Sequence, residues 1–110
     1  MDKEEIIKPV KALIEAMEVE GAELIRSQFS PKFTQAYGTF GQMKSPDAAS
    51  KWLESDIISR KGKFQNPVYT VESENQVVVK GQYASIGYSN KANFLFTVRE
   101  GLITSWRMRY

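Results

Sequence analysis

The chain has 110 residues, the size of a single domain, and its 15 basic and 13 acidic side chains give a formal net charge of +2, which is too balanced to indicate a nucleic-acid or anionic-membrane partner. Cysteine and histidine are both absent, which excludes disulfides and thiolate chemistry and removes the commonest metal ligand and general base. Because no apolar run is long enough for a signal or membrane helix, we expect residues 1–110 to form one cytoplasmic domain without metal or cofactor.

The start of the chain has the apolar spacing of an amphipathic helix. Its apolar residues step by three or four positions: Ile6, Val10, Leu13 and Met17. They predict a helix over residues 3–18. Pro9 lies inside it, and because proline has no N–H to donate and pushes on the preceding turn, we expect either a kink or a regular helix that begins only near Lys8. A shorter helix over 20–28 and a short strand over 33–37 should follow.

A strong helix start lies at Ser45, with proline at the first helical position and Asp47 in the first turn. We expect this third helix to run to about Arg60 and to stop at Gly62. Four strands are then expected over 66–73, 76–87, 91–99 and 102–110. Helices followed by a meander of long strands predict an α+β domain in which the helices cover one face of an antiparallel sheet.

The turn between the last two strands contains Glu100 and Gly101. A glycine adopts positive φ at little cost, whereas a glutamate does not. We therefore expect a type I turn closed by a glycine bulge rather than a type I′ turn.

Both faces of the predicted strands carry apolar residues; in the last strand Trp106 lies on one face and Ile103 on the other. A sheet with helices on one side and water on the other should alternate more cleanly. We therefore expect the second face to pack on another copy of the chain, which would make a homodimer. Arg107 and Arg109 share one strand face, where they could bind an anion or, as we favour, form the rim of that dimer.

Asp56 is the most informative polar residue. At helical spacing it falls inside the apolar stripe that contains Trp52, where burial would raise the pKa of its carboxyl group. It could act as an acid or base in a pocket, or it could form an ion pair with Arg60 one turn later. We favour the ion pair, because such pairs perturb carboxylates as often as catalysis does.

Aromatic side chains with polar tips could line a cavity: Tyr37, Trp52, Tyr69, Tyr83 and Tyr88. Most aromatic residues at such spacings form the core, so we expect only one or two of them to touch a ligand. The sequence has no glycine-rich phosphate loop, nucleophile elbow or cluster of metal ligands.

Three different segments each carry a resemblance to a known family: Val19–Ile25 leading to Phe29, the capped segment Ser45–Leu53, and Phe96–Arg107. The last is close to the ending F-x-V-x-D-G-K-I-x-x-W-x. Together they resemble the nuclear-transport-factor-2-like superfamily, which includes SnoaL-like polyketide cyclases and ketosteroid isomerases, over nearly the whole chain. The resemblance implies a curved antiparallel sheet of four to five strands wrapped around three N-terminal helices, the cystatin-like cone fold. It also implies a pocket in the mouth of the cone and often a homodimer through the sheet.

The catalytic positions of the isomerases fall on residues with different chemistry in this chain. Their oxyanion tyrosine falls at Leu13, which neither donates nor accepts a hydrogen bond. Their general-base aspartate falls at Tyr37, which is a poor base at neutral pH because the ordinary pKa of tyrosine is about 10. Their second oxyanion acid falls at Asn93, which can still donate. Dehydratases and cyclases of the group use histidine–aspartate pairs, and this chain has no histidine. The known chemistries are therefore mostly excluded, whereas a cavity is not.

Three functions stay open. The first is a non-catalytic domain that binds a small apolar or aromatic molecule in the cone and self-associates through its sheet. The second is an isomerase, dehydratase or cyclase with Asp56 or Tyr37 as acid or base, and the third is a protein-interaction or assembly module. The candidate ligand contacts are Tyr37, Trp52, Asp56, Tyr83, Asn93 and Trp106.

Overall fold

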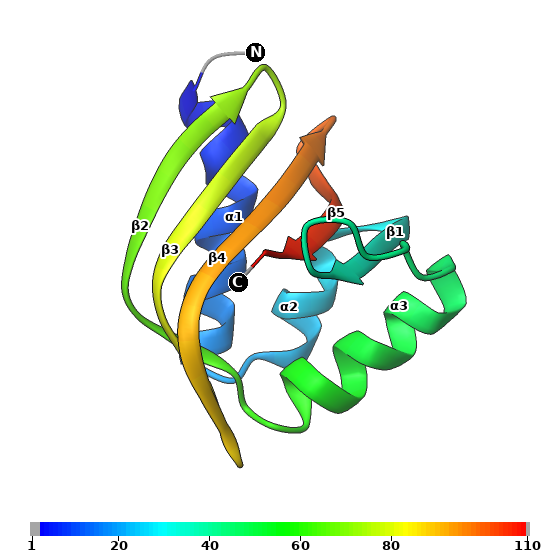
Figure 1. The fold of residues 1–110 in the computed structure, drawn as a ribbon, viewed down its shortest axis with the longest axis vertical. Coiled ribbons are helices and arrows are strands. Elements are labelled where there is room, and N and C mark those ends of the chain that lie inside the picture. Colours follow the sequence, from blue (N-terminus) through cyan, green and yellow to red (C-terminus); the bar gives the residue numbers. More distant parts are fainter. Residues whose placement is uncertain (1–2, 110) are drawn as a thin grey trace.

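The computed structural model describes residues 3–109, and Figure 1 shows the fold. Helix α1 covers Lys3–Glu18 and helix α2 covers Ala22–Ser27, and strand β1 follows over Phe29–Tyr37. Helix α3, Pro46–Trp52, continues directly into a π-helical segment, η1, over Leu53–Ile58. A meander of strands completes the fold: β2 Lys63–Ser73, β3 Gln76–Ser85, β4 Tyr88–Arg99 and β5 Leu102–Met108.

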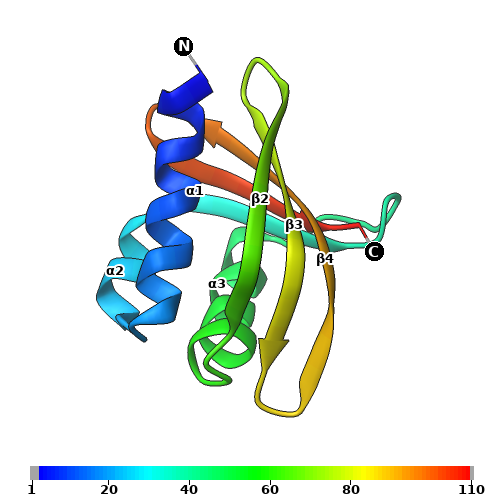
Figure 2. The same cartoon turned by 90° about the vertical axis from the view of Figure 1, so that its left-hand side faces the viewer.

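One five-stranded sheet contains the strands in the order β1-β5-β4-β3-β2. Strands β2 to β5 pair in sequence and antiparallel, as the meander predicts. Strand β1 instead pairs in parallel with β5, so the expectation of a wholly antiparallel sheet is wrong at this edge. A long connection through α3 and three strands separates β1 from β5, which permits parallel pairing. Figure 2 shows the helices on one side of the curved sheet, which confirms the α+β cone.

The core lies between the helices and the face of the sheet that they cover, here called the inner face. Its fully buried side chains include Leu13 and Met17 of α1 and Trp106 of β5. Pro9 is itself buried, and α1 runs without interruption from Lys3, so the expected late start near Lys8 is wrong. The ring of Pro9 contributes apolar contact in exchange for one backbone hydrogen bond. Among the described helices, none combines the length and apolarity that a membrane crossing needs.

The edges of several elements differ from the predicted ones. Helix α2 ends at Ser27, and β1 begins at Phe29 rather than at residue 33, because Phe29 already pairs with Ile103 of β5. The predicted last strand, 102–110, ends at Met108 in the structure, and Tyr110 lies outside the described residues.

Two helical segments end in the same way, with a left-handed residue followed by glycine. Glu20 has a φ of 56° and Lys61 a φ of 53°. The N–H groups of Gly21 and Gly62 bond to carbonyls five residues earlier at 2.9 and 3.0 Å, the pattern of a Schellman motif. The Glu20 carboxylate lies 3.5 Å from the Lys61 ammonium and 2.8 Å from that of Lys63. These ion pairs hold the ends of the two helical segments together.

The third predicted helix begins as expected but widens before it ends. The Ser45 hydroxyl accepts a hydrogen bond from the N–H of Ala48 at 3.2 Å, which caps α3. In η1 the N–H of Ser59 bonds to the carbonyl of Glu54, five residues back, at 2.9 Å. A π-turn holds more residues than an α-turn and shifts the side chains that follow. Asp56 lies inside this widened turn.

A β-bulge bends the sheet where β2 and β3 face each other. Their register shifts between Gln65 and Val68, where Asn66 has a φ of 52°. On β3, Gly81 has a φ of 139°, and a Cβ there would lie 2.8 Å from the Asn66 carbonyl oxygen. Only glycine therefore allows the two backbones to approach. The bulge bends both strands, and just beyond the end of β3 the N–H of Ile86 bonds to the carbonyl of Arg60, two residues after η1, at 2.8 Å.

The hairpin turns are tighter than predicted. Arg99 pairs with Leu102, so Glu100 and Gly101 form a two-residue loop with φ values of 52° and 78°. Positive φ at both positions is typical of a type I′ turn, so the predicted type I turn with a glycine bulge is wrong. The twist of a primed turn matches that of the flanking strands, and this outweighs the cost of a left-handed glutamate. Strand β4 likewise begins at Tyr88, three residues earlier than predicted.

Candidate ligand-binding site

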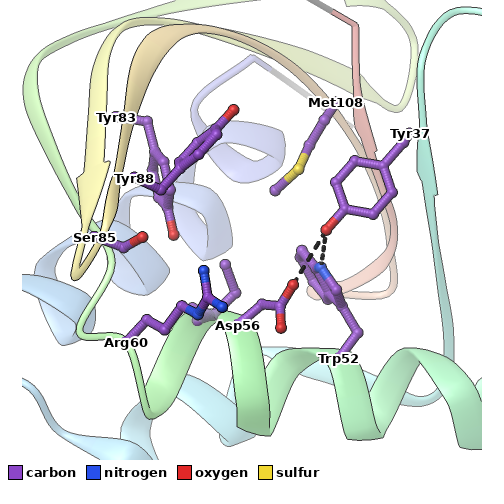
Figure 3. Close-up of a pocket in the computed structure, with 9 residues that line it drawn as sticks. Tyr37, Trp52, Asp56, Arg60, Tyr83, Ser85, Tyr88 and Met108 are labelled. Atoms are coloured by element: carbon purple, nitrogen blue, oxygen red, sulfur yellow. Dashed lines mark hydrogen bonds between the residues drawn. The ribbon is translucent and has the colours of Figure 1, made fainter.

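A cavity of about 230 Å³ opens between the end of the sheet and the α3–η1 segment (Figure 3). Four of its nine lining residues are aromatic: Tyr37, Trp52, Tyr83 and Tyr88. The other lining residues are Asp56, Ile57, Arg60, Ser85 and Met108. These side chains come from β1, from the α3–η1 segment and the turn after it, and from three strands of the meander.

Aromatic side chains fill the interior of the cone and leave only its mouth open. Trp106 is fully buried, and its ring centroid lies 4.8 Å from that of Phe96, 5.7 Å from that of Phe94 and 5.1 Å from that of Trp52. Such separations are typical of stabilising aromatic pairs. The cavity is consequently smaller than the roughly 300–1,000 Å³ of sites for drug-sized ligands, and it suits a molecule with a single substituted ring.

A chain of hydrogen bonds crosses one side of the cavity (Figure 3). The indole N–H of Trp52 donates to the Tyr37 hydroxyl at 2.6 Å, and that hydroxyl donates to Oδ2 of Asp56 at 3.3 Å. The hydroxyl of Ser55 donates to Oδ1 of Asp56 at 2.9 Å. Burial raises the pKa of Tyr37, and the nearby charge of Asp56 adds to the shift. Tyr37 is therefore protonated at neutral pH, and its proton points to Asp56.

The predicted ion pair between Asp56 and Arg60 is not formed. Both residues line the cavity, but the ion pairs of residues 3–109 include neither of them. Asp56 is half-buried rather than enclosed in the core, because Ile57 takes the buried position in the widened turn. The carboxylate is held by Tyr37 and Ser55, and Arg60 points its guanidinium toward the cavity (Figure 3).

Tyr83 forms the opposite wall of the cavity. The residue is 3% exposed, and its hydroxyl is buried without a hydrogen-bond partner. Burial strongly raises the pKa of Tyr83, and the nearby hydroxyl of Ser85 opposes this rise. The Tyr83 and Ser85 hydroxyls are not joined by a hydrogen bond. Gly62 makes room for this ring, because a Cβ there would overlap the Tyr83 hydroxyl. The Tyr83 hydroxyl is thus a protonated donor at neutral pH that no residue of 3–109 uses.

Four of the predicted ligand contacts meet at this cavity, and two lie elsewhere. Tyr37, Trp52, Asp56 and Tyr83 all line it. Trp106 belongs to the core behind Trp52. Asn93 lies between the inward-facing residues of β4, and its side chain donates to the carbonyl of Arg109 at 3.2 Å. Neither Asn93 nor Trp106 is a lining residue of this cavity. Leu13, at the isomerase tyrosine position, is a fully buried core residue.

The two arginines of the last strand are engaged within the chain. Nη1 of Arg107 donates to the carbonyls of Gly38, Thr39 and Gly41 at 2.8, 3.2 and 2.9 Å. It therefore anchors the loop after β1. Arg109 forms an ion pair with Glu72 at 3.2 Å. Both side chains are thus engaged within the chain, each through one guanidinium nitrogen.

Sequence reasoning did not include Ser85 and Met108 among the ligand contacts. Alternation along a strand could have found them, because side chains two residues apart share a face. Ser85 follows Tyr83 by two positions, and Met108 follows Trp106 by two. Within residues 3–109, no group of three or more acidic side chains could hold a metal ion.

No family model and no curated protein match the sequence, but solved structures match its fold. An NTF2-like protein of unknown function from Cytophaga hutchinsonii is 19% identical, with a TM-score of 0.76 over 94% of this chain and 87% of that chain. SalBIII, an epoxide hydrolase/cyclase-like enzyme with a role in pyran ring formation in the polyether salinomycin, is 16% identical, with a TM-score of 0.82 over 98% and 92%. A Mycobacterium tuberculosis protein in complex with estradiol-17β-hemisuccinate is 13% identical, with a TM-score of 0.76 over 96% and 93%.

At these identities the likeness concerns architecture and not activity. The element order, the curved sheet and the matches along nearly the full length of each chain agree with the resemblance noted in the sequence. The chain therefore has the nuclear-transport-factor-2-like cone fold.

Proposed function

We propose that this chain is a non-catalytic domain that binds a small apolar or aromatic molecule in the cavity at the mouth of its cone. The wall of the cavity carries this proposal, because four aromatic rings surround a space with an unpaired buried hydroxyl, that of Tyr83. Buried polar groups are normally hydrogen-bonded, so an unpaired one on a cavity wall favours an occupant. A protein of the same fold in complex with estradiol-17β-hemisuccinate supports small-molecule binding by this architecture.

The test is a thermal-shift screen of single-ring aromatic compounds, followed by a variant that fills the cavity. Compounds that bind the folded state raise the melting temperature by mass action. Ser85→Leu should abolish that rise, because Ser85 lines the cavity. Ser59→Leu is the matched control, since Ser59 is exposed and is not a lining residue. A rise that survives in Ser85→Leu would place binding elsewhere and contradict the proposal.

An enzymatic function is the second candidate, and the Tyr37–Asp56 hydrogen bond of 3.3 Å favours it. Because the pKa of Tyr37 is raised, Asp56 would have to be the base and Tyr37 could only be the acid. SalBIII, described as epoxide hydrolase/cyclase-like, shows that the architecture supports such chemistry in another protein. An Asp56→Asn variant that folds normally but loses a measured turnover would favour this function over simple binding.

Self-association through the sheet completes the proposal. The outer face, opposite to the helices, carries Val68, which is 60% exposed, and the half-buried Leu95, whereas Val78 on the same face is already buried within the chain. Apolar residues on an uncovered face favour a contact with a second copy or with another protein. Sedimentation equilibrium should detect a dimer at micromolar concentration and a monomer for Leu95→Lys. A monomeric wild-type chain that captures no partner would contradict both self-association and the role as an assembly module.

A further inference from the structure

The cavity has two ends with opposite hydrogen-bonding character. One end, here called the donor end, contains the hydroxyls of Tyr83 and Ser85 and the guanidinium of Arg60. The other, here called the acceptor end, contains the carboxylate of Asp56 and the hydroxyl of Tyr37. Figure 3 shows the Tyr83 hydroxyl on the same side as Arg60 and Ser85, away from Tyr37. A ligand that satisfies both ends must itself carry an acceptor and a donor.

The donor end has unused capacity for an anion. The Tyr83 hydroxyl is buried without a partner, and Arg60 takes part in none of the side-chain hydrogen bonds or ion pairs of residues 3–109. A guanidinium beside hydroxyl donors matches a carboxylate, because charge-assisted hydrogen bonds are the strongest in proteins. The hydroxyl of Tyr83 keeps its proton at neutral pH, since burial raises its pKa.

At the acceptor end, the N–H of Trp52 and the O–H of Tyr37 already donate to groups within the protein. The single N–H of Trp52 donates to Tyr37, and the single O–H of Tyr37 donates to Asp56. The carboxylate has about four lone-pair sites, and Tyr37 and Ser55 occupy two of them. What faces the cavity is therefore an acceptor that requires an O–H or N–H group from the ligand.

The surroundings favour a neutral hydroxyl over an ammonium group at the acceptor end. The ammonium of Lys44 lies 4.5 Å from the centroid of the Tyr37 ring, and Arg60, four residues after Asp56, lines the same cavity. These two cations disfavour a third positive charge nearby. The ring of Tyr88 lies beside Tyr83 and that of Trp52 beside Tyr37 and Asp56 (Figure 3), and both rings present flat apolar surfaces that suit an aromatic ring.

We propose, resting on the proposed function, that the ligand is a single-ring aromatic carboxylate with a hydroxyl group on the side of the ring away from the carboxylate. The carboxylate contacts Arg60, and the hydroxyl donates to Asp56. The cavity volume of about 230 Å³ accommodates one substituted ring.

Three probes separate the contributions of the two ends in equilibrium dialysis. 4-Hydroxybenzoate has both groups, benzoate lacks the hydroxyl, and methyl 4-hydroxybenzoate lacks the charge. A hydrogen bond to a charged group changes affinity by about tenfold or more. We expect 4-hydroxybenzoate to bind at least about tenfold tighter than either of the other two probes.

Variants assign each preference to a residue. Arg60→Gln should remove the preference for 4-hydroxybenzoate over its methyl ester and keep the preference over benzoate. Because Arg60 is exposed, this variant should fold normally. Arg99→Gln is the matched control, since Arg99 is also exposed and is not a lining residue.

The outcomes distinguish this inference from the proposed function. If the three probes bind with equal affinity, and Ser85→Leu abolishes the binding of all three, the assignment of the two ends is overturned. The proposed binding function would then still stand. No binding of any probe would contradict both. A preference for 4-hydroxybenzoate that persists unchanged in Arg60→Gln would overturn the role of the donor end.

Discussion

Tyr83→Phe is expected to stabilise the protein without ligand, although most substitutions of buried residues destabilise. The tyrosine is 3% exposed, and its hydroxyl is buried without a hydrogen bond. Burying an unpaired hydroxyl costs about 1–3 kcal/mol in mutational data. The variant removes this cost and keeps the aromatic contacts with Phe64 and Phe94, whose ring centroids lie 5.3 and 5.5 Å away. We expect the free energy of unfolding to rise by about 1 kcal/mol, near the lower end of that range.

Urea and thermal unfolding measure this gain, and the melting temperature should rise by about 4 °C or more. The matched control is Tyr69→Phe. Tyr69 is half-buried outside the cavity, with the Lys11 ammonium 5.4 Å from its ring centroid. Its change in stability should lie within about 0.5 kcal/mol of zero. A loss of about 1 kcal/mol or more in Tyr83→Phe would refute the reasoning, because it would show that the hydroxyl is already satisfied, for example by a buried water.

Three further predictions concern the bulge between β2 and β3, the loop after β1 and the ion pair between Arg26 and Glu54. Gly81→Ala should destabilise by about 3 kcal/mol in urea unfolding, since its φ of 139° and the nearby backbone exclude a Cβ; an unchanged midpoint would contradict this. Arg107→Ala releases the loop carbonyls that it binds, so proteolysis within 38–44 should accelerate, and an unchanged rate would exclude the anchor. Arg26 lowers the pKa of Glu54 from its ordinary 4.5, so this pair stabilises above pH 4.5 and loses its contribution as the pH falls through the lower folded-state pKa. Glu54→Gln should therefore reduce stability slightly at pH 7 and low salt but not at pH 3, and an equal effect at both would contradict the linkage.

Local patterns predicted the helices and the meander, because amphipathic spacing and caps depend on near neighbours. The parallel edge and the early start of β1 depend on β5, far along the chain, and no local signal reports such a pairing. The turn at Glu100 was misjudged for a related reason. The twist of the paired strands decides its type, and twist is a property of the sheet rather than of the two turn residues.

The site was predicted in part, because aromatic residues on one face of a strand can belong either to the core or to a cavity wall. Alternation placed Tyr83 and Trp106 on the inner face, but only the packing of Trp52 against Trp106 decides which ring meets the cavity. Asn93 was assigned by resemblance to a family position, although its neighbours on β4 both point inward. Asp56 could not be placed from α-helical spacing, since η1 widens the helix around it.

The most direct test of ligand binding uses the two tryptophans of the chain. Each gives one indole N–H signal in a ¹H–¹⁵N correlation spectrum; Trp52 lines the cavity, whereas Trp106 is enclosed in the core. Titration with 4-hydroxybenzoate should shift the Trp52 signal in a saturable way and the Trp106 signal much less. Shifts of equal size in both signals, or none in that of Trp52, would contradict binding at the mouth of the cone.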